Sequence, residues 1–161
     1  MTNEPKKLEP AGGADIEAAY AALAQGDLGK LTTAQRVAYL SKLCQSLGLN
    51  ELTQPFLFMP GQNGKIVPYA TANAAAQLRN IHGVSAIIVD QQMKGDLYVV
   101  TARATMPNGR IDESVAAVDL GSLAGERLAN QIMKCETKAK RRATLSIVGL
   151  SMLDETEVEN I

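Results

Sequence analysis

Three β-type runs joined by short turns constrain the fold of this chain more than any other feature. They are VSAIIVDQQ, DLYVVTARATM and RIDESVAAVDL, at residues 84–92, 96–106 and 110–120. The turns at Lys94–Asp96 and Pro107–Gly109 are so short that consecutive strands are expected to pair antiparallel. A three-stranded meander cannot bury enough apolar surface alone, so a helix must cover one face. The predicted cover is the helical segment from about Leu123 to Val148.

The segment before the strands predicts further helices. Thr32 can cap a helix in TTAQRVAYLSKLCQSLGLN, Gln35 is placed to complete a capping box, and Gly48 is a C-terminal stop. Its apolar residues recur at helical spacing: Val37, Leu40, Leu43, Cys44 and Leu47. A shorter helix, DIEAAYAALAQG, is expected to end at Gly26.

A hairpin and one more helix complete the pattern. PFLFMPGQNGKIVPYA holds two β-type runs around Asn63-Gly64, a hairpin signal. TANAAAQLRNIHG returns to helix and ends at Gly83. The predicted class is therefore α+β, with a β-hairpin and a three-stranded antiparallel meander packed against a long central helix. Such antiparallel strands exclude a parallel nucleotide-binding sheet.

Length and composition predict one domain. Of the 161 residues, 1–14 combine Pro, Gly and charge and predict a disordered tail, so the domain is expected to cover 15–161. The chain has neither a secretory signal nor an apolar run of the roughly 18 to 20 residues that a membrane span needs, which predicts a cytoplasmic protein. Cys44 and Cys135 are expected to be reduced, packed thiols rather than a disulfide or metal pair.

The charges are distributed unevenly along the chain. Although the formal net charge is -1, the segment from Glu126 to Arg142 carries six cations and two anions. The segment from Ser151 to Ile161 carries four anions and no cation. Because local fields steer a charged ligand, the near-neutral total does not exclude a polyanion as partner.

The long predicted helix concentrates these cations on one side. On a helical wheel a cationic stripe lies within about 80° of Lys134, and comprises Arg127, Lys134, Lys138, Arg141 and Arg142. Beside it runs an apolar stripe of Leu128, Ile132, Cys135, Ala139 and Ala143. Lys140 lies off the cationic stripe, and Glu136 points elsewhere, so the stripe contains no carboxylate. Two interpretations stay open, a surface for a phosphate backbone and an ordinary solvated helix face.

Signals for catalysis are weak. His82, the one histidine, precedes Gly83 at a helix end, where a capping or surface role fits better than a general base. The sequence has no GxxxxGK[ST] loop and no Cys/His cluster with metal spacing. With 4% aromatic residues and no tryptophan, it offers few rings on which bases could stack. These features favour a non-enzymatic polyanion binder without a cofactor.

Two segments are similar to a known family. LGLNELTQPFLFMPGQNGKIVPYA resembles the helix end, Gly-Leu-Asn turn and β-hairpin of the phage Red beta/RecT single-strand annealing proteins. KAKRRATLSIVGLSMLDETEVENI resembles the basic helix and closing acidic segment of that family. The similarity extends from about residue 36 to residue 161, although the middle strands match only in pattern.

The resemblance implies an ATP-independent recombinase that binds single-stranded DNA and anneals it to a complementary strand through a duplex intermediate. It also implies a homo-oligomer, either a ring or a helical filament, in the cytoplasm of a bacterial host. DNA would lie in a groove between the hairpin and the long helix. Longer relatives also bind an exonuclease or a host single-strand-binding protein, which makes these candidate partners. The implied DNA contacts are Lys65, Lys134, Lys138, Arg141 and Arg142, with Arg79 and Arg127 as weaker candidates.

Two alternatives belong to other classes of protein. The basic helix could dock acidic protein partners, including the DETEVE segment of another subunit, and make the chain a self-assembling interaction module. Alternatively, Asp154, Glu155 and Glu157 could hold Mg²⁺ in a small nuclease, although no converging ligand is evident for them.

Overall fold

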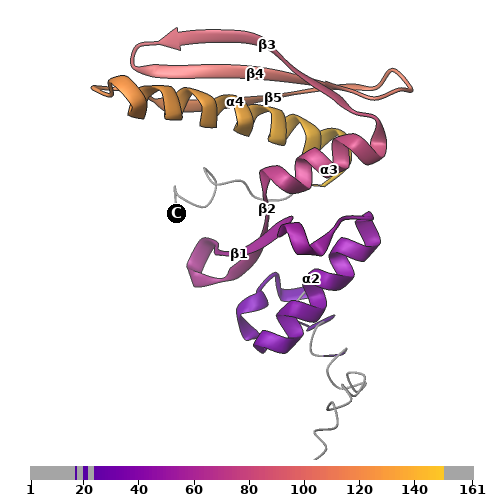
Figure 1. The fold of residues 1–161 in the computed structure, drawn as a ribbon. Coiled ribbons are helices and arrows are strands. Elements are labelled where there is room, and N and C mark those ends of the chain that lie inside the picture. The colour runs from indigo at the N-terminus through magenta and orange to yellow at the C-terminus, as the bar shows by residue number, and fades with distance from the viewer. Residues whose placement is uncertain (1–16, 18–19, 22–23, 151–161) are drawn as a thin grey trace, which may run out of the picture.

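The computed structural model describes residues 17, 20–21 and 24–150, and Figure 1 shows their arrangement. The helices are α2 (Thr33–Leu47), α3 (Ala72–His82) and α4 (Gly125–Ile147), with 3-10 turns η1 (Leu28–Lys30), η2 (Glu51–Thr53) and η3 (Gln62–Gly64). The strands are β1 (Phe56–Pro60), β2 (Ile66–Ala70), β3 (Ser85–Lys94), β4 (Leu97–Thr105) and β5 (Ile111–Asp119). This order confirms the predicted α+β class.

Some predictions fall partly or wholly outside the described residues. The described residues between 17 and 25 are helical, and Gly26 follows with a φ of +62°, in agreement with the short helix expected there. The predicted disordered tail, residues 1–14, lies outside the described residues. So does the acidic segment 151–161.

The meander forms one antiparallel sheet in the order β3-β4-β5, and α4 lies across one of its faces (Figure 1). Side chains alternate along β4, so Val100, Ala102 and Ala104 point toward α4 and are fully buried. A bulge at Val89 shifts the pairing of β3 with β4. The predicted strands and their helical cover are both confirmed.

Alanines are five of the nine buried residues in the core between the sheet and α4. Ala139 and Ala143 of α4 are fully buried against the alanines of β4 and against Ala116 of β5. Because these residues have only a methyl group, the helix backbone can lie close to the sheet. The predicted apolar stripe therefore faces the sheet, and the cationic stripe must face away from it.

A second core lies on the other side of α4, where α2, α3 and the β1–β2 hairpin meet (Figure 1). Its buried residues are Cys44, Leu49, Phe56, Ala70, Ala74, Leu78 and Leu145. Leu145 comes from the last turns of α4, so this helix contributes to both cores. The position of the hairpin beside α4 follows from that shared packing.

Local signals place the ends of these elements. Thr32 Oγ1 accepts a hydrogen bond from the Gln35 amide at 3.2 Å, and Gln35 Oε1 accepts one from the Thr32 amide at 2.9 Å. The predicted capping box is therefore present. Gly83 ends α3 with a φ of +64°, and a Cβ there would lie 3.0 Å from Cγ of Pro107. Both the backbone conformation and this close approach favour glycine.

The hairpin prediction is also confirmed, although the loop is longer than a two-residue turn. Residues 61–65 connect the strands, and the Gly61 amide donates to the Lys65 carbonyl at 2.6 Å. Asn63 and Gly64 have φ values of +58° and +72°. These left-handed conformations explain why an Asn-Gly pair occurs there.

The two cysteines lie in different cores. Cys44 lies in the core where α2, α3 and the hairpin meet, and Cys135 lies in the core between α4 and the sheet. Burial raises the pKa of both thiols above the ordinary value of 9.0. This agrees with the prediction of two separate, packed thiols. Within the described part of the chain, no helix has the length and apolar surface that crossing a bilayer requires.

Candidate nucleic-acid interface

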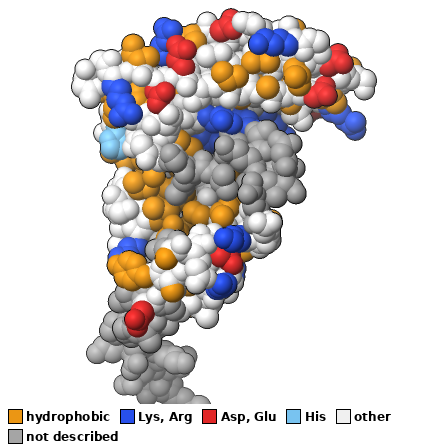
Figure 2. Space-filling view, turned by 180° about the vertical axis from the view of Figure 1, so that it is seen from behind, with side chains coloured by type: hydrophobic (Ala, Val, Ile, Leu, Met, Phe, Trp, Pro, Cys, Tyr) orange, Lys and Arg blue, Asp and Glu red, His pale blue; other side chains and the backbone are white. Residues whose placement is uncertain are grey.

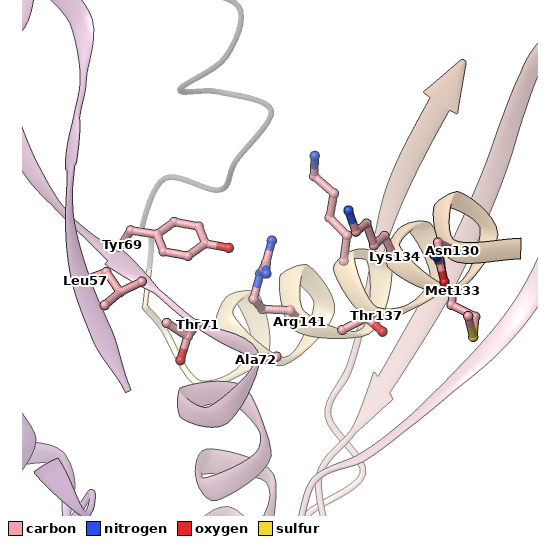
Figure 3. Close-up of a pocket in the computed structure, with 10 residues that line it drawn as sticks. Leu57, Tyr69, Thr71, Ala72, Asn130, Met133, Lys134, Thr137 and Arg141 are labelled. Carbon is pink, nitrogen blue, oxygen red and sulfur yellow. The ribbon is translucent and has the colours of Figure 1, made fainter. Parts of the chain in front are cut away.

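A cavity of about 530 Å³ lies between the β1–β2 hairpin, the start of α3 and the exposed side of α4 (Figure 3). We call it the hairpin–α4 groove. Its lining residues are Leu57, Tyr69, Thr71, Ala72, Asn130, Met133, Lys134, Thr137, Lys138 and Arg141. Three of these described residues are cationic and none is acidic.

Helical spacing explains the α4 wall of the groove. Lys134, Lys138 and Arg141 are four and then three residues apart, so they lie on one side of the helix. Asn130 and Thr137 fall within about 60° of Lys134 on the same wheel. These three members of the predicted cationic stripe therefore line the same cavity.

The hairpin and α3 supply the opposite wall. Leu57 of β1 and Tyr69 of β2 are direct cross-strand partners, and both line the groove. Thr71 and Ala72 line it where β2 passes into α3. Thr71 Oγ1 donates to the Pro55 carbonyl at 3.1 Å and thereby ties the start of α3 to the start of β1. The wall is therefore held by pairing between strands and by a bond across the hairpin base.

Arg141 has a different environment from the two lysines. It is only 5% exposed, and its guanidinium carbon lies 5.2 Å from the centroid of the Tyr69 ring, within range of a cation–π contact. Figure 3 shows the Tyr69 hydroxyl directed toward Arg141. The helical wheel placed Arg141 in the cationic stripe, and the structure buries its side chain at the base of the groove, against the hairpin.

Lys134 and Lys138 both line the groove, and Figure 3 shows Lys134 on its α4 side. Lys134 is exposed and Lys138 is half-buried. Among the described residues, neither ammonium has a carboxylate within ion-pair distance; the ion pair found there joins Arg103 to Glu113 on the sheet. Glu136, the nearby acid on α4, accepts from Gln91 Nε2 at 2.9 Å and so points toward the sheet.

The remaining predicted contacts lie outside the groove lining. Lys65 is exposed beside the hairpin loop, and its Nζ donates to the Gln25 carbonyl at 3.1 Å. Arg127 is exposed near the start of α4, about two turns before Lys134. Arg142 is half-buried and adjacent to the groove residue Arg141.

Arg79 joins α3 to α4. Its Nη1 donates to Thr144 Oγ1 at 3.2 Å, and burial lowers the pKa of the guanidinium from its ordinary value. Thr144, which is fully buried, also donates to the Lys140 carbonyl at 2.7 Å. The side chain of Arg79 thus connects two helices, and its contact with DNA stays a prediction.

The uncharged half of the groove was not predicted from the sequence. Asn130 and Thr137 could have been found on the helical wheel, since both lie within about 60° of Lys134, whereas Met133 is about 100° away and the wheel does not group it with the stripe. Leu57 and Tyr69 were inside the hairpin that the sequence identified, but their common orientation depends on the register of β1 with β2. Their approach to α4 depends on packing between distant segments.

Comparison of the chain with models of known protein families found no match, and no curated protein matches it significantly. The resemblance to the Red beta/RecT proteins therefore stays a prediction from the two quoted segments.

Proposed function

We propose that this chain binds single-stranded DNA in the hairpin–α4 groove and anneals complementary strands without ATP. The observation that carries the proposal is the composition of the groove. Lys134, Lys138 and Arg141 line it, and none of its described lining residues is acidic. A cationic cavity of this kind favours a polyanion. The resemblance to the annealing proteins, which implies DNA binding between the hairpin and the long helix, supports the same proposal.

Binding would be driven by contacts between lysine ammonium groups and phosphates. Such contacts release counterions and do not depend on base sequence, so affinity falls steeply as salt rises. The edges of the bases would stay available for pairing, and complementarity would supply the test of sequence. No step in this scheme requires nucleotide hydrolysis.

Assembly into an oligomer would raise the overall affinity for DNA above the weak affinity of one subunit. One groove engages only a short length of strand, whereas a ring or filament holds many grooves at high effective concentration. We include a homo-oligomer, action in the cytoplasm of a bacterial host, and an exonuclease or host single-strand-binding protein as partner in the proposal. All three derive from the resemblance.

The test compares two double variants with the same change in charge. Lys134→Ala with Lys138→Ala removes both groove lysines. The control, Lys42→Ala with Lys94→Ala, removes two exposed lysines of α2 and β3 that lie outside the groove. We expect the groove variant to bind an oligonucleotide more weakly and to anneal complementary strands more slowly, with the control near the parent protein.

Salt dependence provides a second measurement. If two phosphate contacts are lost, the slope of log affinity against log salt should become shallower by about 1.4 for a single strand. Equal affinities, slopes and annealing rates for the two double variants would contradict the proposal. Binding of a polyglutamate peptide instead of DNA would support the alternative, a module that docks acidic proteins.

A further inference from the structure

The hairpin–α4 groove combines charge with exposed apolar side chains. Leu57 on the hairpin is 42% exposed and Met133 on α4 is 56% exposed, and both line the cavity that also holds Lys134 and Lys138. In Figure 3, Leu57 lies on the hairpin side and Met133 on the α4 side, with the base of the groove between them. A single exposed apolar residue needs no explanation, but two in one cationic cavity indicate the chemistry of a ligand.

The matching ligand is anionic along one side and apolar along another. A single nucleic-acid strand has this character, because its phosphates are charged and the faces of its unstacked bases are apolar. A duplex presents phosphates to the outside and hides the base faces in its stack. An acidic peptide has carboxylates but no regular row of flat, apolar rings.

We infer that Leu57 and Met133 contact the faces of the bases while Lys134 and Lys138 hold the phosphates. This inference rests on the proposed function and adds a preference for strands with exposed bases. The isobutyl group and the thioether have no strong hydrogen-bonding atoms, so they would not read the pairing edges of a base. Methionine also contacts aromatic rings favourably through its polarizable sulfur.

The experiment measures the affinity of the full chain for two probes with the same charge. One is an oligothymidine, and the other is an equally long oligomer of abasic tetrahydrofuran-phosphate units. The parent protein should prefer the oligothymidine by about two- to tenfold, the size of one contact between a thioether and an aromatic ring. Leu57→Ala with Met133→Ala should remove this preference while binding the abasic oligomer as tightly as the parent.

A matched control replaces exposed apolar residues elsewhere. Val37 on α2 and Leu52 on η2 are 62% and 88% exposed and do not line the groove. Val37→Ala with Leu52→Ala should keep the full preference for oligothymidine. If Leu57→Ala disturbs the hairpin, Met133→Gln alone is the second variant, because glutamine has nearly the same shape and helix propensity. It should reduce the preference on its own.

The outcomes separate this inference from the proposed function. A parent protein that binds both probes equally would overturn the base contacts but leave phosphate binding intact. A parent protein that binds neither probe would overturn the proposed function itself. Retention of the full preference in both the double variant and Met133→Gln would show that other residues contact the bases.

Discussion

At the scale of single residues, equal charge does not mean an equal role. Lys134, Lys138 and Arg141 share one side of α4, yet Arg141 lies buried against the Tyr69 ring while Lys134 is exposed. The difference arises because the hairpin approaches α4 at Arg141. A guanidinium suits that position, since it is weakly hydrated and can lie against an aromatic face.

Asp27 shows how one carboxylate can join two segments. Its Oδ1 accepts from the Gly29 amide at 2.9 Å and from the Ile66 amide at 3.1 Å, so it connects η1 to β2. The hydrogen bond from the Gly29 amide, and to a smaller extent that from the Ile66 amide, holds the pKa of the carboxyl group below the ordinary value of 3.8. The charged form is therefore the one that stabilises the fold.

From this we predict a pH-dependent effect of Asp27→Asn. A lowered folded-state pKa gives stability that is present above the unfolded pKa and is lost as pH falls through the folded pKa. The parent protein should therefore be more stable than Asp27→Asn at neutral pH, and the difference should shrink below pH 3.8. Urea unfolding at several pH values measures it. A difference independent of pH would show that the charge is not involved.

At the scale of elements, the two longest helices begin in different ways. The capping box of Thr32 and Gln35 fixes the start of α2 through neighbouring residues. The N-cap of α4, Ala124, makes no side-chain cap hydrogen bond. The position of α4 therefore depends on its contacts with the sheet, which are extensive, more than on a local start signal.

We predict that Thr32→Ala lowers the free energy of unfolding by about 1 kcal/mol, because the amide of Gln35 loses its side-chain acceptor. The next residue offers a matched control. Thr33 is exposed and lies just inside the helix, so Thr33→Ala should change stability little. Urea denaturation of both variants decides the matter, and equal losses would contradict a capping role for Thr32.

At the scale of the whole molecule, α4 is the element that both cores share. Ala139 packs against the sheet, and Leu145 packs with α2, α3 and the hairpin. Figure 2 shows basic side chains gathered beneath the sheet layer, on the side toward the lower part of the molecule. The groove is thus formed where the sheet and helix layer meets the hairpin.

We predict that Ala139→Leu destabilises the protein by about 1–3 kcal/mol, because a larger side chain cannot fit between α4 and the sheet without displacing one of them. Ala129→Leu is the control, since Ala129 is exposed on the same helix. The measurement is the midpoint of urea unfolding, with oligonucleotide binding as a second readout. An unfolding midpoint for Ala139→Leu equal to that of the parent protein would show that α4 and the sheet can move apart without loss of stability.

The sequence alone determined where the helices and strands lie along the chain and which residues share each side of α4. Capping residues, turn glycines and alternating or helical apolar spacing act between near neighbours, so they could be recognised without a structure. This is why the capping box at Thr32, the hairpin around Asn63-Gly64 and the meander with its helical cover were all predicted. The cationic stripe was predicted for the same reason, because helical geometry fixes which residues share a side.

Only the tertiary structure decided which residues of distant segments each side of α4 and of the hairpin contacts. Arg79 bonds to Thr144, which is 65 residues away in the chain, and Lys65 bonds to the carbonyl of Gln25, which is 40 residues away. A helical wheel gives the direction of Arg141 but not the Tyr69 ring opposite it. The apolar half of the groove was missed for this reason, since its residues come together only when the hairpin packs beside α4.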